Sequence, residues 1–150
     1  MYDLQELYQE FVLDHSRRPR NFRKLEDPDW TGEGFNPLCG DQITLYLKID
    51  DDIISEVGFE GVGCAISKAS ASMMTEGIKG KSKAEAKKIF DEFRRMITNG
   101  SGGDIDVELL GDMEILSGVS KYPARIKCAI LSWHTLNSAL TDSNQTVSTE

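Results

Sequence analysis

The sequence predicts a small antiparallel β-sheet that has one face covered by helices. The main evidence is that apolar and polar residues alternate over residues 43–49, a pattern typical of strands with one buried face. A second strand is expected directly afterwards, over residues 53–59, and the acidic run at 50–52 predicts the turn of a hairpin between them. A third strand is expected at about residues 30–35.

Four further segments have apolar residues at intervals of three and four, as amphipathic helices do. Asp3 is a good cap for the first helix, and Ser82 and Glu85 form a capping box at the start of the third. The second helix opens directly after Cys64, and Pro123 suits the first turn of the last one. We expect these helices at about residues 3–14, 65–79, 82–99 and 123–140.

The rest of the chain is expected to connect these elements. Residues 100–122 contain Gly and Asp and read as a connection with a short apolar segment at 107–116. The chain from residue 141 is polar, so we expect a disordered, frayed tail at 141–150. At 150 residues, with no repeat and no linker, the sequence predicts one domain over residues 1–150.

Composition and charge narrow the class of function. The formal net charge is −8, and because phosphate contacts dominate nucleic-acid affinity, we expect no nucleic-acid partner. We expect no membrane association either, since no apolar run is long enough to span a bilayer and the N-terminus does not resemble a signal peptide. A cytoplasmic location is therefore expected. There, three cysteines indicate metal or sulfur chemistry more than a disulfide framework.

The segment from Asn36 to Asp41 carries the strongest chemical signal. Cys39 and Asp41 are two positions apart, so in an extended chain both side chains point the same way and can reach one ion. Cys64 is expected at a helix N-terminus, where the helix dipole stabilises a thiolate. Cys128 lies on the last expected helix, directly after Lys127 and three residues after Arg125. Two such cations favour a thiolate. We expect a shared metal site of Cys39, Asp41, Cys64 and Cys128.

Less specific interpretations remain open at this point. The cysteine spacings match no zinc finger and no CxxC is present, so three unrelated buried cysteines are the alternative. The basic run at residues 15–21 is either a docking patch for an acidic partner or a solvated helix exit. His15 has no motif partner, and His134 is expected to face away from Cys128. The glycines at 58–63 fit neither a P-loop nor a dinucleotide site.

Three cysteine-containing segments stand in order along the chain, namely Asn36-Pro37-Leu38-Cys39-Gly40-Asp41, Gly61-Val62-Gly63-Cys64-Ala65-Ile66-Ser67 and Arg125-Ile126-Lys127-Cys128-Ala129. Together they resemble the cysteine motifs of the U-type iron–sulfur cluster assembly proteins. The resemblance extends from the N-terminal helix, including His15, to about Leu140. It implies an α+β fold in which a small antiparallel three-stranded sheet packs against several helices. It also implies a site of three cysteines and one aspartate, and a cysteine desulfurase as partner.

Within this family the sequence is most similar to the SufU branch. The scaffold branch carries a histidine directly before its third cysteine, where this sequence has Lys127, and it has a shorter connection than residues 100–122. The resemblance implies a Zn²⁺ cofactor and a zinc-dependent sulfurtransferase, in which Cys39 accepts persulfide sulfur from a SufS-type desulfurase. Arg125 matches a docking arginine of that branch, and Arg125 and Lys127 are expected to bind the partner.

Two other functions are considered beside this one. The first is a scaffold on which a [2Fe–2S] cluster is assembled and passed to downstream iron–sulfur assembly proteins, with iron or a transient cluster in place of zinc. The second is a structural zinc protein without chemistry of its own, in which the four ligands form a closed site.

Overall fold

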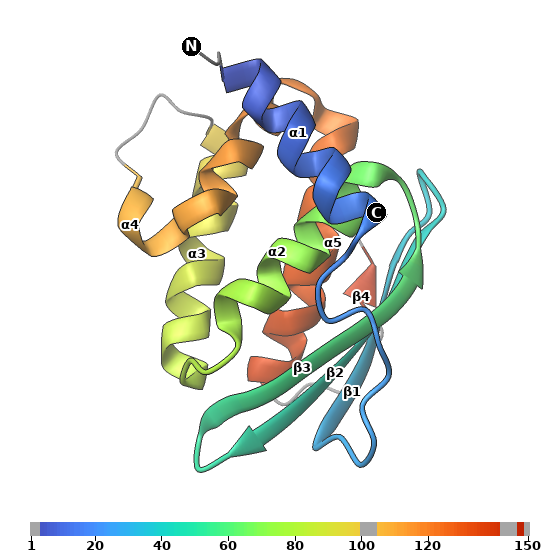
Figure 1. Ribbon diagram of the computed structural model, residues 1–150, viewed down its shortest axis with the longest axis vertical. Helices are drawn as coiled ribbons and strands as arrows, with labels where there is room; N and C mark the ends of the chain where they lie inside the picture. Colours follow the sequence, from blue (N-terminus) through green and yellow to red (C-terminus); the bar gives the residue numbers. More distant parts are fainter. Residues whose placement is uncertain (1–3, 100–104, 142–146, 149–150) are drawn as a thin grey trace.

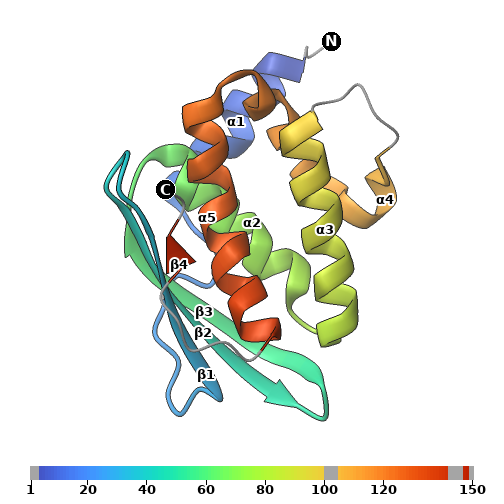
Figure 2. The same ribbon diagram turned by 180° about the vertical axis from the view of Figure 1, so that it is seen from behind.

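The computed structural model describes residues 4–99, 105–141 and 147–148. A twisted sheet forms one layer, and the helices lie together on one of its faces (Figures 1 and 2). This is the α+β architecture that the sequence predicts. No helix in the described ranges is long and apolar enough to cross a membrane.

The sheet is built from three antiparallel strands and one short parallel addition. The strand order is β3-β2-β1-β4. The strands span Trp30–Asn36 (β1), Asp41–Asp50 (β2), Ile53–Val62 (β3) and Val147–Ser148 (β4). The expected hairpin and third strand are thus confirmed. Within the segment expected to be a frayed tail, β4 pairs with β1 at Gly34 and Phe35, while residues 142–146 and 149–150 lie outside the described part.

The helices begin and end close to where the sequence places them, except in the segment after α3. They span Leu4–Arg17 (α1), Ala65–Ile78 (α2), Lys83–Asn99 (α3), Val107–Leu110 (α4) and Pro123–Leu140 (α5), with a 3₁₀ helix at Gly111–Lys121 (η2). The first helix runs three residues further than expected. Its expected cap, Asp3, lies outside the described residues.

The segment after α3, expected only as a connection with a short apolar segment, is helical over residues 107–121. The side chain of Asp106 accepts the backbone N–H of Leu109 and caps α4. Buried apolar side chains then recur every third residue, at Leu110, Met113, Leu116 and Val119. Positions i and i+3 eclipse in a 3₁₀ helix, so this interval places the four side chains on one face, against the other helices.

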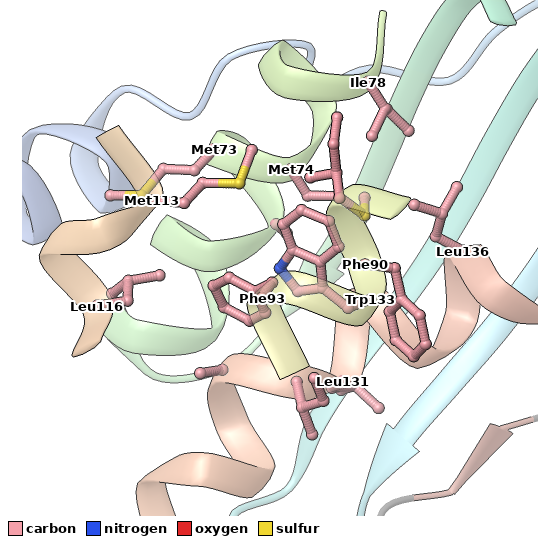
Figure 3. Packing of buried hydrophobic residues seen from close by; sticks show 14 of the residues in the cluster. Met73, Met74, Ile78, Phe90, Phe93, Met113, Leu116, Leu131, Trp133 and Leu136 are labelled. Carbon is pink, nitrogen blue, oxygen red and sulfur yellow. The ribbon is translucent and has the colours of Figure 1, made fainter. Parts of the chain in front are cut away.

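A single hydrophobic core fills the space between the sheet and the helices. Trp133 of α5 and Phe93 of α3 stack with ring centroids 4.5 Å apart, and Met73 and Met74 of α2 lie beside them (Figure 3). On the sheet side, the inward-facing residues of β2 and β3 are buried, among them Leu45, Leu47, Val57 and Phe59. The core therefore ties α2, α3 and α5 to the sheet.

β1 and β2 form the first hairpin. The packing of α5 against β1 brings the N-terminal half of α5 close to the loop of this hairpin. Gly34 makes this close approach possible, because a Cβ atom there would lie 2.2 Å from Oγ1 of Thr135 and 3.1 Å from Leu131. The loop between β1 and β2 and the connection from β3 to α2 lie at the same end of the sheet (Figure 1). Three segments that are distant in sequence thus meet at one place.

Candidate metal centre

The first hairpin presents two buried polar side chains to the helices. Asn36 and Asp41 are the last paired residues of β1 and β2, and both are completely buried. They share the inward face with Gly34 and Ile43, the pair two positions away in the register, because alternate residues of a strand point to the same side. The four-residue loop between them carries Cys39, whose side chain is exposed.

Cys64 is held next to Asp41 by the start of α2. It is the N-cap of that helix, and its sulfur accepts the backbone N–H of Ser67 at 3.4 Å. Its own backbone N–H donates to Oδ1 of Asp41 at 2.9 Å. Gly63 permits this contact, because a Cβ atom at that position would lie only 2.6 Å from the same carboxylate oxygen.

Cys128 reaches the hairpin loop from α5. Its sulfur lies 3.5 Å from the sulfur of Cys39 and 3.7 Å from the carbonyl oxygen of Ala124. Ligand atoms of Cys39, Asp41 and Cys128 all lie within 4.8 Å of one another. The structure thus brings three of the four expected ligands into one group. Cys64 adjoins this group through its backbone bond to Asp41.

The donor set is one that Zn²⁺ accepts. Three sulfur atoms and one carboxylate match the soft and hard ligands of tetrahedral zinc sites. Burial raises the pKa of the Cys128 thiol, and hydrogen bonding with Asp41 and Cys39 raises it further. Ionised thiols so close together repel one another unless a cation compensates their charge. A divalent ion bound by these groups would supply that charge.

The two expected partner-binding residues differ in their surroundings. Arg125 is exposed, and a hydrogen bond with Cys128 raises the pKa of its guanidinium group, helped by the negative charge of Cys64, Cys128 and Cys39. Arg125 therefore faces the thiols from the solvent side. Lys127 is half-buried.

Large apolar side chains are exposed around the thiols. Leu38 precedes Cys39 and is 62% exposed, and Val62, two positions before Cys64, is 61% exposed. Tyr122, at the start of α5, is 62% exposed. Exposed apolar residues close to a polar site are typical of surfaces that contact another protein. We call Leu38, Val62 and Tyr122 the apolar rim.

The histidines lie away from the thiols and are held within the protein. His134 is half-buried and packs edge-to-face on Phe90 with centroids 5.7 Å apart, as expected of a histidine that faces the core. His15, which had no partner in the sequence, is 4% exposed, and its Nδ1 lies 2.7 Å from Oγ of Ser72 in α2. His15 thus ties α1 to the helix that begins at Cys64.

Part of the positive charge of the basic run at residues 15–21 is neutralised by ion pairs within the protein. The guanidinium of Arg20 lies 2.7 Å from Asp14 and 4.0 Å from Glu76. Arg17 and Arg18 are exposed. A docking role for this run would therefore fall mainly on Arg17 and Arg18.

Asn36 is a site residue to which the sequence analysis assigned no role. Its Nδ2 donates to Oδ2 of Asp41 at 3.1 Å and approaches the sulfur of Cys128 at 3.6 Å. A usable signal was present in the sequence. Asn36 and Asp41 flank a four-residue loop between two strands, and such flanking residues face each other across a hairpin.

Comparison with known proteins agrees with this geometry. The model of the NifU-like N-terminal domain family matches residues 7–129, which include the three cysteines and Asp41. The chain belongs to the U-type family of iron–sulfur cluster assembly proteins. Its α+β fold is also found among solved members of that family. The structure of a SufU-type scaffold protein from Fervidobacterium islandicum superposes with a TM-score of 0.83 at 40% identity, covering 91% of this chain and 98% of that one.

Two curated relatives of this U-type protein carry different functional names. A zinc-dependent sulfurtransferase, SufU of Bacillus subtilis, is 48% identical over 134 residues, which is 89% of each chain. An iron–sulfur cluster assembly scaffold protein, IscU of Streptococcus pyogenes, is 44% identical over 137 residues, covering 91% of this chain and 84% of that protein. Similarity alone therefore does not separate the two functions.

Proposed function

We propose that this protein is a zinc-dependent sulfurtransferase of iron–sulfur cluster assembly, which accepts sulfur on Cys39 from a SufS-type cysteine desulfurase. The observation that carries the proposal is the meeting of Cys39, Asp41 and Cys128 within 4.8 Å, in a chain that is 48% identical to a zinc-dependent sulfurtransferase. Cys39, Asp41, Cys64 and Cys128 are the proposed zinc ligands. Bound zinc would hold the thiols as thiolates and protect them from oxidation.

The exposure of the three thiols supports Cys39 as the sulfur acceptor. Cys39 is exposed on a loop, Cys64 is half-buried at a helix start and Cys128 is buried. A group that attacks a partner's persulfide must reach out of its own protein, and a loop permits this movement better than a packed helix does.

The transfer itself needs no oxidant or reductant. The Cys39 thiolate attacks the terminal sulfur of the persulfide on the desulfurase cysteine. A new sulfur–sulfur bond forms on Cys39, the sulfur–sulfur bond on the desulfurase breaks, and the desulfurase cysteine leaves as a thiolate. One persulfide is consumed and one is formed, so electrons balance.

The surface around the thiols supports a protein as the donor of sulfur. The apolar rim offers area that a partner can cover, and Arg125 adds a cation where a neighbouring acidic group can pair with it. We propose that Arg125 and Lys127 contact the desulfurase together with this rim.

Single-turnover transfer tests the proposal. The zinc-loaded protein is mixed with a SufS-type desulfurase and cysteine, quenched, digested and examined by mass spectrometry. We expect one added sulfur atom on the Cys39 peptide and none in Cys39→Ser. Persulfide first on Cys64 or Cys128, with Cys39 unmodified, would contradict the assignment of the acceptor. Absence of persulfide from all three cysteines would contradict a sulfurtransferase.

A cluster scaffold is the second candidate, supported by the 44% identity to a named scaffold protein. Anaerobic reconstitution with iron and sulfide separates the two functions. A sulfurtransferase retains zinc and accepts sulfur without building a cluster. A stable [2Fe–2S] absorption spectrum, with zinc displaced and cluster passed to an apo-acceptor, would favour the scaffold instead.

A further inference from the structure

Asn36 has contacts that hairpin closure alone does not require. The amide nitrogen carries two hydrogens, and in the described part of the chain it has two acceptors, Oδ2 of Asp41 at 3.1 Å and the sulfur of Cys128 at 3.6 Å. Asn36 is completely buried, so water does not compete for these hydrogens. Both acceptors are proposed zinc ligands, and they come from different elements, β2 and α5.

Asn36 also has an unsatisfied group. Its Oδ1 is buried and has no hydrogen-bond partner among the described residues. A 180° flip of the side-chain amide would not satisfy Oδ1, because Oδ1 would then face the carboxylate oxygen of Asp41, and two acceptors repel each other. An unsatisfied buried polar atom is unfavourable for stability, so the amide at this position is better explained by the site than by the stability of the fold.

We propose that Asn36 is a positioning residue that orients Asp41 and Cys128 for metal binding. The inference rests on the proposed zinc site. Asp41 is held from both sides, since Oδ1 accepts the backbone N–H of Cys64 at 2.9 Å and Oδ2 accepts the amide of Asn36. Each carboxylate oxygen has a second lone pair free for a metal.

Two substitutions separate the amide's role from its shape. Asn36→Asp keeps the shape and replaces the two donors by a second carboxylate beside Asp41. Asn36→Ala removes the donors without adding charge. Loss of a hydrogen bond to a metal ligand weakens metal binding by roughly 10- to 100-fold, and we expect this for both variants in zinc competition with a chelator. The matched control is Asn137→Asp in α5, because Asn137 bonds Lys87 at 3.0 Å and does not contact the site.

Two further measurements exclude a merely structural role. The absorption bands of the Co²⁺-substituted protein report ligand geometry, and we expect them to shift in both Asn36 variants and to stay unchanged in Asn137→Asp. The exchanged pair, Asn36→Asp with Asp41→Asn, restores a hydrogen bond across the hairpin with its direction reversed. When both proteins are free of metal, we expect the exchanged pair to have the melting temperature of the parent. We do not expect it to recover the parent's zinc affinity.

The outcomes distinguish this inference from the proposed function. If the parent protein binds no zinc, both are overturned. If the parent binds zinc and both Asn36 variants match it in affinity and Co²⁺ spectrum, only the role of Asn36 is overturned. The same holds if the exchanged pair regains the parent's zinc affinity, or if zinc loss only follows the unfolded fraction measured by circular dichroism.

Discussion

The sulfur atoms of Cys39 and Cys128 lie 3.5 Å apart, although the two residues are 89 positions apart in the chain. One sulfur is on the loop of the first hairpin and the other is on α5. Their distance therefore depends on how α5 lies against the sheet, and on the small residues that permit this approach. Changes that move either element should affect the site before they affect the rest of the fold.

Gly63→Ala should displace Asp41 from the site. The added Cβ would lie 2.6 Å from Oδ1 of Asp41, closer than such atoms approach each other, so the carboxylate or the start of α2 must move. We expect zinc affinity to fall by at least tenfold, a change of about 1.4 kcal/mol, as measured by chelator competition. Gly118→Ala is the matched control, because nothing lies within 4 Å of a Cβ atom there. Equal zinc affinity of parent and Gly63→Ala would show that this contact does not set the position of Asp41.

Asp41→Ala should turn a four-ligand site into a three-ligand site that is open to water. We expect weaker zinc retention and a lower melting temperature in the presence of zinc. Under saturating zinc, each tenfold loss of affinity lowers the free energy of unfolding by about 1.4 kcal/mol, which lowers the melting temperature by roughly 4 °C for a protein of this size. Calorimetry with and without a chelator measures both effects. If the two proteins hold zinc equally well, Asp41 is not a ligand.

Arg125→Ala should weaken binding of the desulfurase and leave zinc in place, because arginine is not a ligand. An arginine at the centre of an interface typically contributes more than 1 kcal/mol, so we expect roughly a tenfold loss of affinity by calorimetric titration. Arg94→Ala on α3 is the control for removing one positive charge. Loss of zinc together with binding would mean that Arg125 supports the thiols themselves, which it faces in the structure.

The basic run near α1 can be tested in the same titration. Because Arg20 is paired with Asp14 and Glu76, we expect the charges of Arg17 and Arg18 to contribute more to any docking. Arg17→Ala with Arg18→Ala should slow association with the desulfurase most strongly at low salt. An unchanged association rate at every salt concentration would show that the basic run is a solvated helix exit and not a docking patch.

His15 should make the metal-free protein less stable in mild acid. Burial lowers the pKa of His15 below its ordinary value of 6.5, and Arg20 lowers it further, although Glu76, Asp14 and Asp112 oppose this. The unfolded chain therefore binds a proton at a higher pH than the folded one does. Stability contributed by neutral His15 is present above about pH 6.5 and is lost as the pH falls through the folded-state pKa.

His15→Gln keeps a neutral polar group near Ser72 and should reduce this pH dependence. We expect the drop in melting temperature between pH 7.5 and pH 5.5 to be smaller in the variant than in the parent, with both proteins freed of metal. His134→Gln is measured in the same way for comparison with His15→Gln, because burial lowers the pKa of His134 as well. An identical drop in parent and His15→Gln would show that His15 does not titrate over this range.

The sequence alone determined the features that depend on the local pattern of apolar and polar residues. Alternation over β2 and β3 and the three- and four-residue intervals of the helices reflect which faces are buried, so these elements could be placed from residue order alone. Cys39 and Asp41 could be assigned to one site because they lie two positions apart, and their ligand atoms do lie within 4.8 Å. The extended chain assumed between them is wrong, because residues 37–40 form a turn in which Gly40 has a φ of 74°. The 3₁₀ helix at Gly111–Lys121 was missed for a related reason, because its apolar residues recur at intervals of three rather than alternating between three and four.

Only the tertiary structure decided which distant groups touch. The amide of Asn36 reaches Cys128, Arg125 faces the thiols, and Arg20 is paired with Asp14 and Glu76. Hydrogen bonds and ion pairs of this kind depend on the positions of single atoms after whole elements have packed together. Residue periodicity records which face of an element is buried, but it does not record what lies opposite that face.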